Sequence, residues 1–222
     1  AVVSTLTLKD EYTNHDRPGD KIIGATVKEI SESLIPPAEP TEEPRAPELT
    51  EGRPLADLPV SEREYIFQKR PSMVIDIRKA YYALVETTRG KIRLKLYPDA
   101  APESVNNFYI LAKQGYWDNF PVSHVLTHRY VIIGTPRKGR PESDIGYSIP
   151  PEVSRKQIIG GVGYWLSASQ DRRSSGSILA FVLTNDPNSI SVLTYFGMVE
   201  EGLDVVRALT MDDVIKKIDI IE

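Results

Sequence analysis

The stretch from residue 81 to 133 constrains the fold most, because its apolar residues alternate as they do in short strands and then change to helical spacing. In the segment KIRLKL at 91–96, every second residue is Ile or Leu and the others are Lys or Arg, which indicates a half-buried strand. The turn TTRG at 87–90 joins it to a preceding apolar run at 81–85. Together these segments predict a β-hairpin.

A helix is expected next. Pro102 is tolerated in a first helical turn, apolar residues recur at helical spacing from 105 to 112, and Gly115 is a typical helix stop. Two more apolar runs, at 122–126 and 130–133, predict strands.

The C-terminal part continues the same pattern. Strands are expected around 163–166, 178–183, 195–199 and 214–221, and a short helix at 202–209. Many short strands with two helices predict a mainly β fold, a closed antiparallel barrel capped by two helices.

The segment Ser31–Val60 has a different composition, with seven prolines and seven acidic residues but two arginines. Proline at this density excludes continuous helix or sheet. Upstream, an alternating run at 3–8 and an apolar stripe at 22–34 are compatible with one strand and one short helix. We expect residues 1–60 to form an extended arm, which is either a disordered spacer or a segment that lies across a partner protein.

Residues 61–80 regain the features of ordered structure. Ser61 and Glu64 have the spacing of a capping box, which predicts a short helix that buries the following apolar residues of 65–67. The run MVIDI at 73–77 reads as a further strand or an extended docking segment. The predicted organisation is therefore an arm at 1–60, a short helix and docking segment at 61–80, and a compact domain at 81–222.

Composition excludes several functions. The chain has no cysteine, which excludes disulfides, thiolate nucleophiles and Cys-ligated zinc. Its net charge of −4 argues against nucleic acid as the main partner. No apolar run approaches the roughly 20 residues that a membrane span needs. The basic runs at 137–140 and 172–173 are interpreted as solvated turns, with an anionic contact as the alternative.

The order of these elements resembles the cyclophilin family of peptidyl-prolyl isomerases. The resemblance is carried by GKIRLKLYPDAAPESVNNFYILAKQGYWDNF from Gly90, GYSIPPE from Gly146, SGS from Ser175 and YFGMVEEGLDVVRAL from Tyr195. It extends over roughly residues 80–222. It implies the barrel described above and a groove that binds proline-containing peptides, with no metal and no cofactor.

The resemblance also implies a mechanism. An X-Pro bond isomerises slowly because amide resonance sets a barrier of about 18–20 kcal/mol. In the family, an arginine donates to the prolyl nitrogen and weakens that resonance, while apolar walls hold the proline ring. A gap-free alignment between Trp117 and Gly134 places His124 at the arginine position. The other groove positions that can be placed also differ in residue type from the family, so no catalytic residue is expected. The degenerate groove comprises His124, Arg129, Tyr130, Ile132, Ala180, Asn188 and Leu193.

Two other interpretations of this region were weighed. His128 and Arg129 look locally like the family's His-Arg pair, but Arg129 lies only five residues before Gly134, and the family spacing would require a deletion within a strand. His124 and His128 are four residues apart, which suits a metal pair on a helix but not on a strand. A neutral imidazole at position 124 would offer one hydrogen-bond donor and no permanent charge. The protonated imidazole would also carry a positive charge, but it forms only in acidic solution.

The functional expectation is a catalytically inactive, cyclophilin-like structural or interaction subunit whose arm contacts protein subunits of a larger complex. Docking on a membrane complex is one form of this expectation. The alternative is a weak or specialised prolyl isomerase, or a chaperone for proline-containing peptides. A third class, an RNA-associated factor, would use the basic loop at 137–140. Because the sequence starts at Ala1, we expect a processed chain in an organelle, the thylakoid lumen or the periplasm.

Overall fold

The structure is a computed structural model that describes residues 43–137, 144–152, 159–166, 173–185 and 193–222. Residues 43–222 form one compact unit. The elements expected within 1–34, most of the basic loop at 137–140, and Asn188 lie outside the described residues.

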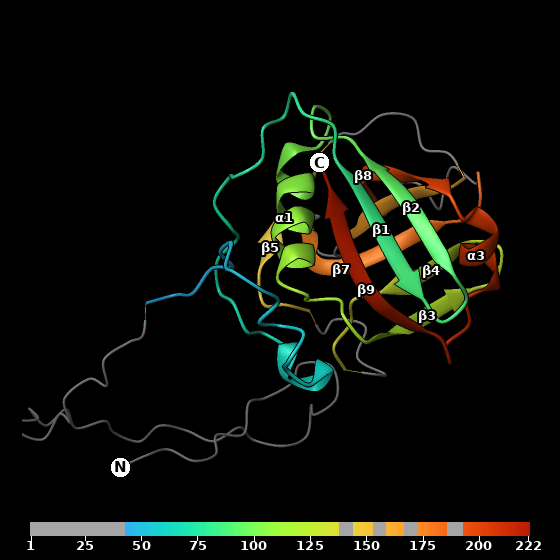
Figure 1. Cartoon of the computed structure of the whole chain (residues 1–222), viewed down its shortest axis with the longest axis horizontal. Coiled ribbons are helices and arrows are strands. Elements are labelled where there is room, and N and C mark those ends of the chain that lie inside the picture. The colour runs from blue at the N-terminus through green and yellow to red at the C-terminus, as the bar shows by residue number, and fades with distance from the viewer. Residues whose placement is uncertain (1–42, 138–143, 153–158, 167–172, 186–192) are drawn as a thin grey trace, which may run out of the picture. The chain divides into compact units, whose positions relative to one another are not determined.

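The chain folds into a closed antiparallel barrel (Figure 1). Eight strands of the described chain follow one another in the order β4-β3-β9-β1-β2-β8-β6-β7, and pairing of β4 with β7 closes the ring. The short β5 continues the sheet beyond β7. This arrangement confirms the predicted mainly β barrel. The strands are β1 (Tyr82–Thr87), β2 (Lys91–Leu96), β3 (Phe120–Leu126), β4 (Tyr130–Ile133), β5 (Ser148–Ile149), β6 (Gly161–Leu166), β7 (Ser174–Val182), β8 (Leu193–Glu201) and β9 (Val214–Ile221).

The predicted hairpin is formed by β1 and β2. The N–H of Thr87 donates to the carbonyl of Gly90 at 2.8 Å, and the Thr87 hydroxyl bonds within the same turn. Gly90 has a φ of +146°, a value that side-chain-bearing residues rarely adopt. In β2 the alternating Ile92, Leu94 and Leu96 face the core as predicted, and in β1 Ala83 and Val85 do so while Leu84 lies on the opposite face.

The two predicted helices are α1 (Pro102–Lys113) and α3 (Leu203–Ala208). Helix α1 packs against β8 and β9, and Pro102 occupies its first turn as expected. The carboxylate of Glu152 accepts the N–H groups of Glu103 and Ser104 at 3.0 and 2.8 Å, so a negative charge lies at the positive end of the helix. Gly115, with φ +77°, follows the helix and lets the chain turn into the barrel.

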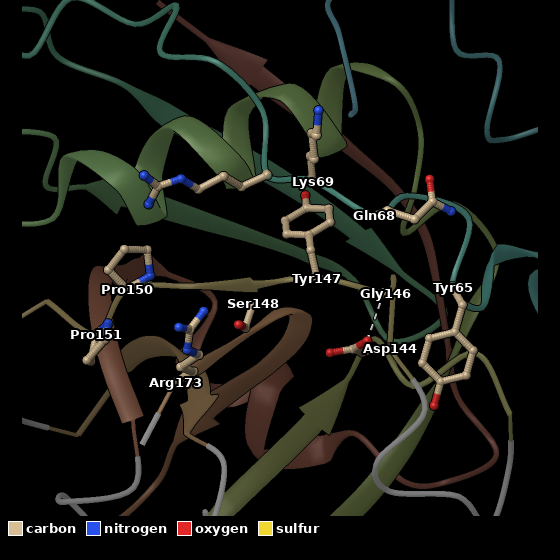
Figure 2. A pocket seen from close by; sticks show the side chains of 11 residues that line it. Tyr65, Gln68, Lys69, Asp144, Gly146, Tyr147, Ser148, Pro150, Pro151 and Arg173 are labelled. Carbon is tan, nitrogen blue, oxygen red and sulfur yellow. Dashed lines mark hydrogen bonds between the residues drawn. The ribbon is translucent and has the colours of Figure 1, made fainter. Parts of the chain in front are cut away.

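We call residues 43–80 the strap. It follows an irregular course along the domain and contributes Leu55, Phe67 and Ile75 to the barrel's own core. The N–H groups of Tyr65 and Phe67 donate to the carbonyls of residues 144 and 145, so the strap runs beside the segment that carries Gly146 and Tyr147 (Figure 2). Residues 43–60, which the sequence assigns to the arm, therefore pack on the domain of their own chain.

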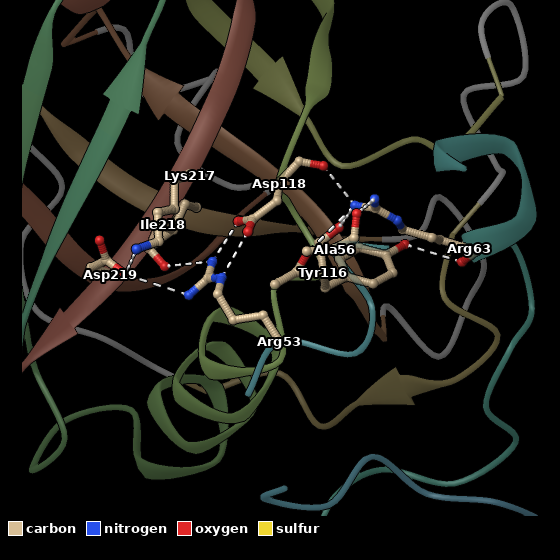
Figure 3. Close-up of polar contacts among 9 residues, drawn as sticks. Arg53, Ala56, Arg63, Tyr116, Asp118, Lys217, Ile218 and Asp219 are labelled. Carbon is tan, nitrogen blue, oxygen red and sulfur yellow. Dashed lines mark hydrogen bonds and ion pairs between the residues drawn. The ribbon is translucent and has the colours of Figure 1, made fainter. Parts of the chain in front are cut away.

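One arginine fastens the strap. The guanidinium of Arg63 is almost completely buried and donates to five backbone carbonyls, two in the strap and three in the loop between α1 and β3 (Figure 3). The bonds to the carbonyls of Tyr116 and Asp118 are both 2.7 Å. Burial lowers the pKa of Arg63, and the nearby Asp118 opposes that shift. A single side chain thus supplies the hydrogen bonds that two adjoining loops need in the interior.

A second arginine connects the strap to the C-terminal strand. Arg53 Nε donates to Asp118 Oδ2 at 2.7 Å, and its other nitrogens reach the carbonyl of Ile218 and the carboxylate of Asp219 on β9 (Figure 3). The strap is therefore held by polar bonds at both the α1–β3 loop and β9.

The capping box predicted at Ser61 is wrong. The element there is a four-residue 3-10 helix, η2 (Val60–Arg63), which is preceded by Pro59 and has no side-chain cap. Tyr65 has a φ of +53° and is 53% exposed, so the chain leaves the helical conformation before the residues expected to be buried. The reason is tertiary: the bonds of Arg63 and the pairing of 65–67 with 144–145 determine the local conformation.

Candidate peptide-binding groove

The strands β4, β7 and β8 have apolar side chains on both faces. On β4, Val131 and Ile133 enter the main core, while Tyr130 and Ile132 point to the opposite face, as the strand period of two requires. The side chains of this second face form a separate cluster, which we call the outer cluster: Tyr130, Ile132, Ile178, Ala180, Val182, Leu193 and Tyr195. Each of them is at most 9% exposed.

The structure brings several of the predicted groove positions together. His124 on β3 is the register partner of Ile132 on β4, and Ile132 is the partner of Ala180 on β7. Directly opposed residues share a face of the sheet, so these three positions form one row across three strands. Tyr130 and Leu193 belong to the same cluster.

A β-bulge positions His124. The register of β3 against β4 shifts between Val122, which opposes Ile133, and His124, which opposes Ile132. The extra residue, Ser123, accepts the N–H of Thr135 at 3.4 Å. The bulge places His124 on the face of the outer cluster, where its imidazole is exposed to solvent.

Arg129 lies in the turn that joins β3 to β4, and it is exposed. The N–H of Arg129 donates to the carbonyl of Leu126, and its own carbonyl accepts the N–H of Leu183. His128, in the same turn, has a φ of +61°. The local His-Arg pair of the sequence therefore occupies a turn, whereas His124 occupies the strand.

Tyr195 belongs to the site but was not among the predicted residues. Its side chain is 4% exposed, and its hydroxyl has no hydrogen-bond partner among the described residues. Burial, with Tyr130 close by, raises the pKa of Tyr195. Tyr195 lies two positions after Leu193 on β8, so the two side chains share a face of the sheet. This two-residue alternation is the sequence signal that could have identified Tyr195 as part of the site.

The outer cluster is thus a buried aliphatic and aromatic layer, and the exposed imidazole of His124 lies at its edge. Trp165 packs edge-on against Tyr130, with ring centroids 5.8 Å apart. Strand β3 carries no arginine. In the described part of the chain, no group of three or more His, Cys, Asp or Glu side chains is arranged to hold a metal ion, and no helix is long and apolar enough to cross a bilayer.

Comparison with known proteins identifies the family. The model of the cyclophilin type peptidyl-prolyl cis-trans isomerase/CLD family matches residues 82–221. The chain therefore belongs to the cyclophilin family.

Among its relatives is the peptidyl-prolyl cis-trans isomerase of Synechococcus elongatus, 32% identical over 142 residues, which are 63% of this chain and 95% of that protein. Peptidyl-prolyl cis-trans isomerase B of Bacillus subtilis is 31% identical over 140 residues, 63% of this chain and 96% of that protein. The crystal structure of a Cryptosporidium parvum cyclophilin type isomerase superposes with a TM-score of 0.57 at 18% identity and covers 65% of this chain and 99% of that one. This last likeness concerns the fold alone.

Proposed function

We propose that this chain is a peptide-binding cyclophilin domain that accelerates prolyl isomerisation only weakly. The observation that carries the proposal is the row of His124, Ile132 and Ala180 across β3, β4 and β7. An exposed imidazole stands where the resemblance implies an arginine, and it lies beside a branched aliphatic side chain.

Weak catalysis follows from the hydrogen-bond donor that the prolyl nitrogen of a bound peptide would meet. A guanidinium carries a permanent charge and five N–H donors, whereas a neutral imidazole has one donor. Removing a preorganised donor from an enzyme site lowers the rate by roughly 10²–10³-fold. The apolar side chains of the outer cluster are at most 9% exposed and lie beside His124, so a proline ring bound at His124 would contact only their edges.

The relatives support the catalytic part of this proposal, since they are named as isomerases at about 30% identity. They favour the weak isomerase over the inactive complex subunit that the sequence also suggests. The subunit role remains a prediction, for which partner copurification with the full chain is the appropriate measurement.

A prolyl-isomerase assay tests the proposal. We expect the full chain to accelerate isomerisation of an Ala-Pro test peptide about 100-fold less than the Bacillus subtilis isomerase B measured beside it. His124→Arg restores the charge at an exposed strand position and should raise kcat/KM by about tenfold. Thr127→Arg adds the same charge in the exposed turn and should leave the rate unchanged.

Two results would contradict the proposal. A wild-type rate equal to that of the Bacillus subtilis protein would show that the outer cluster catalyses without an arginine. A rate indistinguishable from the uncatalysed reaction, for the wild type and for His124→Arg, would favour the inactive subunit.

A further inference from the structure

A second recess lies apart from the outer cluster. It has a volume of about 1090 Å³ and is bounded by the strap on one side and by the segment around β5 on the other (Figure 2). Tyr65, Lys69 and Arg70 line it from the strap, and Tyr147 and Ser148 line it from β5 and the residue before it. The family match begins at residue 82, so the strap wall belongs to a part of the chain that the family model does not include.

One wall of the recess is a free sheet edge. Within the described part of the chain, strand β5 is the last strand of the sheet and pairs with β7 alone. The Tyr147 carbonyl accepts the N–H of Gly176 on β7. Successive residues of an antiparallel strand direct their backbone groups to opposite edges, so the N–H and C=O of Ser148 point away from β7 and toward the recess.

The strap bonds to the irregular segment that precedes β5. Tyr65 and Phe67 donate their N–H groups to the carbonyls of Asp144 and Ile145. Beyond Phe67 the strap turns aside, where the N–H groups of Gln68 and Lys69 both donate to the carbonyl of Arg45. The strap therefore bonds to residues 144 and 145 and turns aside before Ser148, whose outward N–H and C=O can pair with an extended peptide.

The charges around this edge are mainly positive. Lys69 lies on the strap wall and Arg173 on the opposite wall (Figure 2), and Arg70 follows Lys69 in the strap and also lines the recess. Lys69 has no ion pair among the described residues, and the pair between Arg70 and Glu103 is long, at 3.7 Å, and half exposed. Among the described residues that line the recess, Asp144 is the one acidic residue, and it accepts the N–H of Gly146 and the hydroxyl of Ser175.

We propose that this recess binds an extended acidic peptide segment of a partner protein. The peptide backbone pairs with the N–H and C=O of Ser148 along the free edge of β5. Its carboxylates face Lys69, Arg70 and Arg173. Edge pairing supplies affinity without sequence preference, and the cationic walls select acidic segments.

The experiment measures fluorescence anisotropy of a labelled peptide, Glu-Val-Glu-Val-Glu-Val-Glu, titrated with the full chain, beside a peptide in which Gln replaces Glu. We expect the acidic peptide to bind at least tenfold more tightly, and its binding to weaken as salt rises. Lys69→Glu and Arg173→Glu, both exposed, should each weaken binding roughly five- to tenfold. Lys216→Glu, an equally exposed change on β9, serves as the matched control.

A second arm tests the edge itself. Ser148→Pro removes only the N–H that points away from β7, so it should leave the barrel folded and abolish most peptide binding. If that variant fails to fold, an acidic peptide N-methylated at alternate residues, which cannot donate to the edge, answers the same question with the unmodified protein.

Several results would overturn the inference: equal binding of the Gln peptide, an unchanged affinity after Lys69→Glu and Arg173→Glu, or full competition by millimolar inorganic phosphate, which would indicate a small-anion site. Unchanged binding of the N-methylated peptide would exclude edge pairing. Because His124→Arg alters the outer cluster alone, it should leave this binding unchanged, so the inference and the proposed isomerase function fail independently.

Discussion

The strap and the outer cluster differ in their position relative to the part of the chain that matches the cyclophilin family. The outer cluster lies within the stretch that matches the cyclophilin family, yet a histidine stands where the resemblance implies an arginine. The strap lies before that stretch, yet it is joined to the domain by the buried Arg63 and by three core side chains. The comparison teaches that the family scaffold, its groove chemistry and its added segments can change separately.

The energetic basis of the two regions also differs. The strap depends on a few directional hydrogen bonds from arginine, which fail together when one side chain is removed. The outer cluster depends on many non-directional apolar contacts, which a neighbouring side chain can partly replace. Removal of the buried Arg63 should therefore have a larger effect than removal of one side chain from the outer cluster.

The largest effect is expected for Arg63→Ala. It removes the guanidinium that donates to five backbone carbonyls, three of them in buried hydrogen bonds, and should lower the free energy of unfolding by about 3–5 kcal/mol. Denaturant unfolding measures it, with Arg78→Ala as the control, since Arg78 is exposed and should change stability little. A loss below about 1 kcal/mol would show that the strap is not held by this residue.

A smaller effect is expected for Ile132→Ala in the outer cluster. Deleting a buried isoleucine side chain costs about 2–5 kcal/mol, and the 9% exposure of Ile132 places it near the lower end. Ile133→Ala, at a completely buried position of the main core on the same strand, should cost more. Thermal and denaturant melts of the two variants compare the faces, and the reverse order would make the outer cluster the more tightly packed layer.

A moderate coupling is expected between Arg53 and Asp118. Their paired hydrogen bonds are partly buried, so a double-mutant cycle with Arg53→Ala and Asp118→Asn should give about 1–2 kcal/mol. The same cycle for the exposed Arg93 and Glu200 should give less than about 1 kcal/mol. Equal couplings would show that the strap contact has the energy of an ordinary surface pair.

The smallest effect is expected for Tyr195→Phe. A buried hydroxyl without a partner carries a desolvation cost, so its removal should stabilise the protein by up to about 1 kcal/mol. The melting temperature would then rise slightly while the isomerase rate stays unchanged. A destabilised variant would show that the hydroxyl has a partner, and a slower isomerase would place Tyr195 in the reaction.

Much of the fold followed from local patterns. The strand alternation at 91–96, Pro102 in the first turn of α1 and Gly115 after it all express preferences of neighbouring residues, and the structure agrees with each. The strap was harder to predict, because proline and acidic residues are as frequent in spacers as in docked segments. Its attachment depends on carbonyls far away in the chain that no local pattern reveals.

The candidate site shows the same division. The sequence alone determined the family and the barrel, and it predicted His124 at the position where the resemblance implies an arginine, because residue type and spacing are local properties. Only the tertiary structure decided that His124, Ile132 and Ala180 share one row, that Arg63 closes the strap onto the α1–β3 loop, and that β5 keeps a free edge beside three cationic side chains. These features depend on strand register and on packing between distant segments, which are set by the burial and pairing of the whole chain.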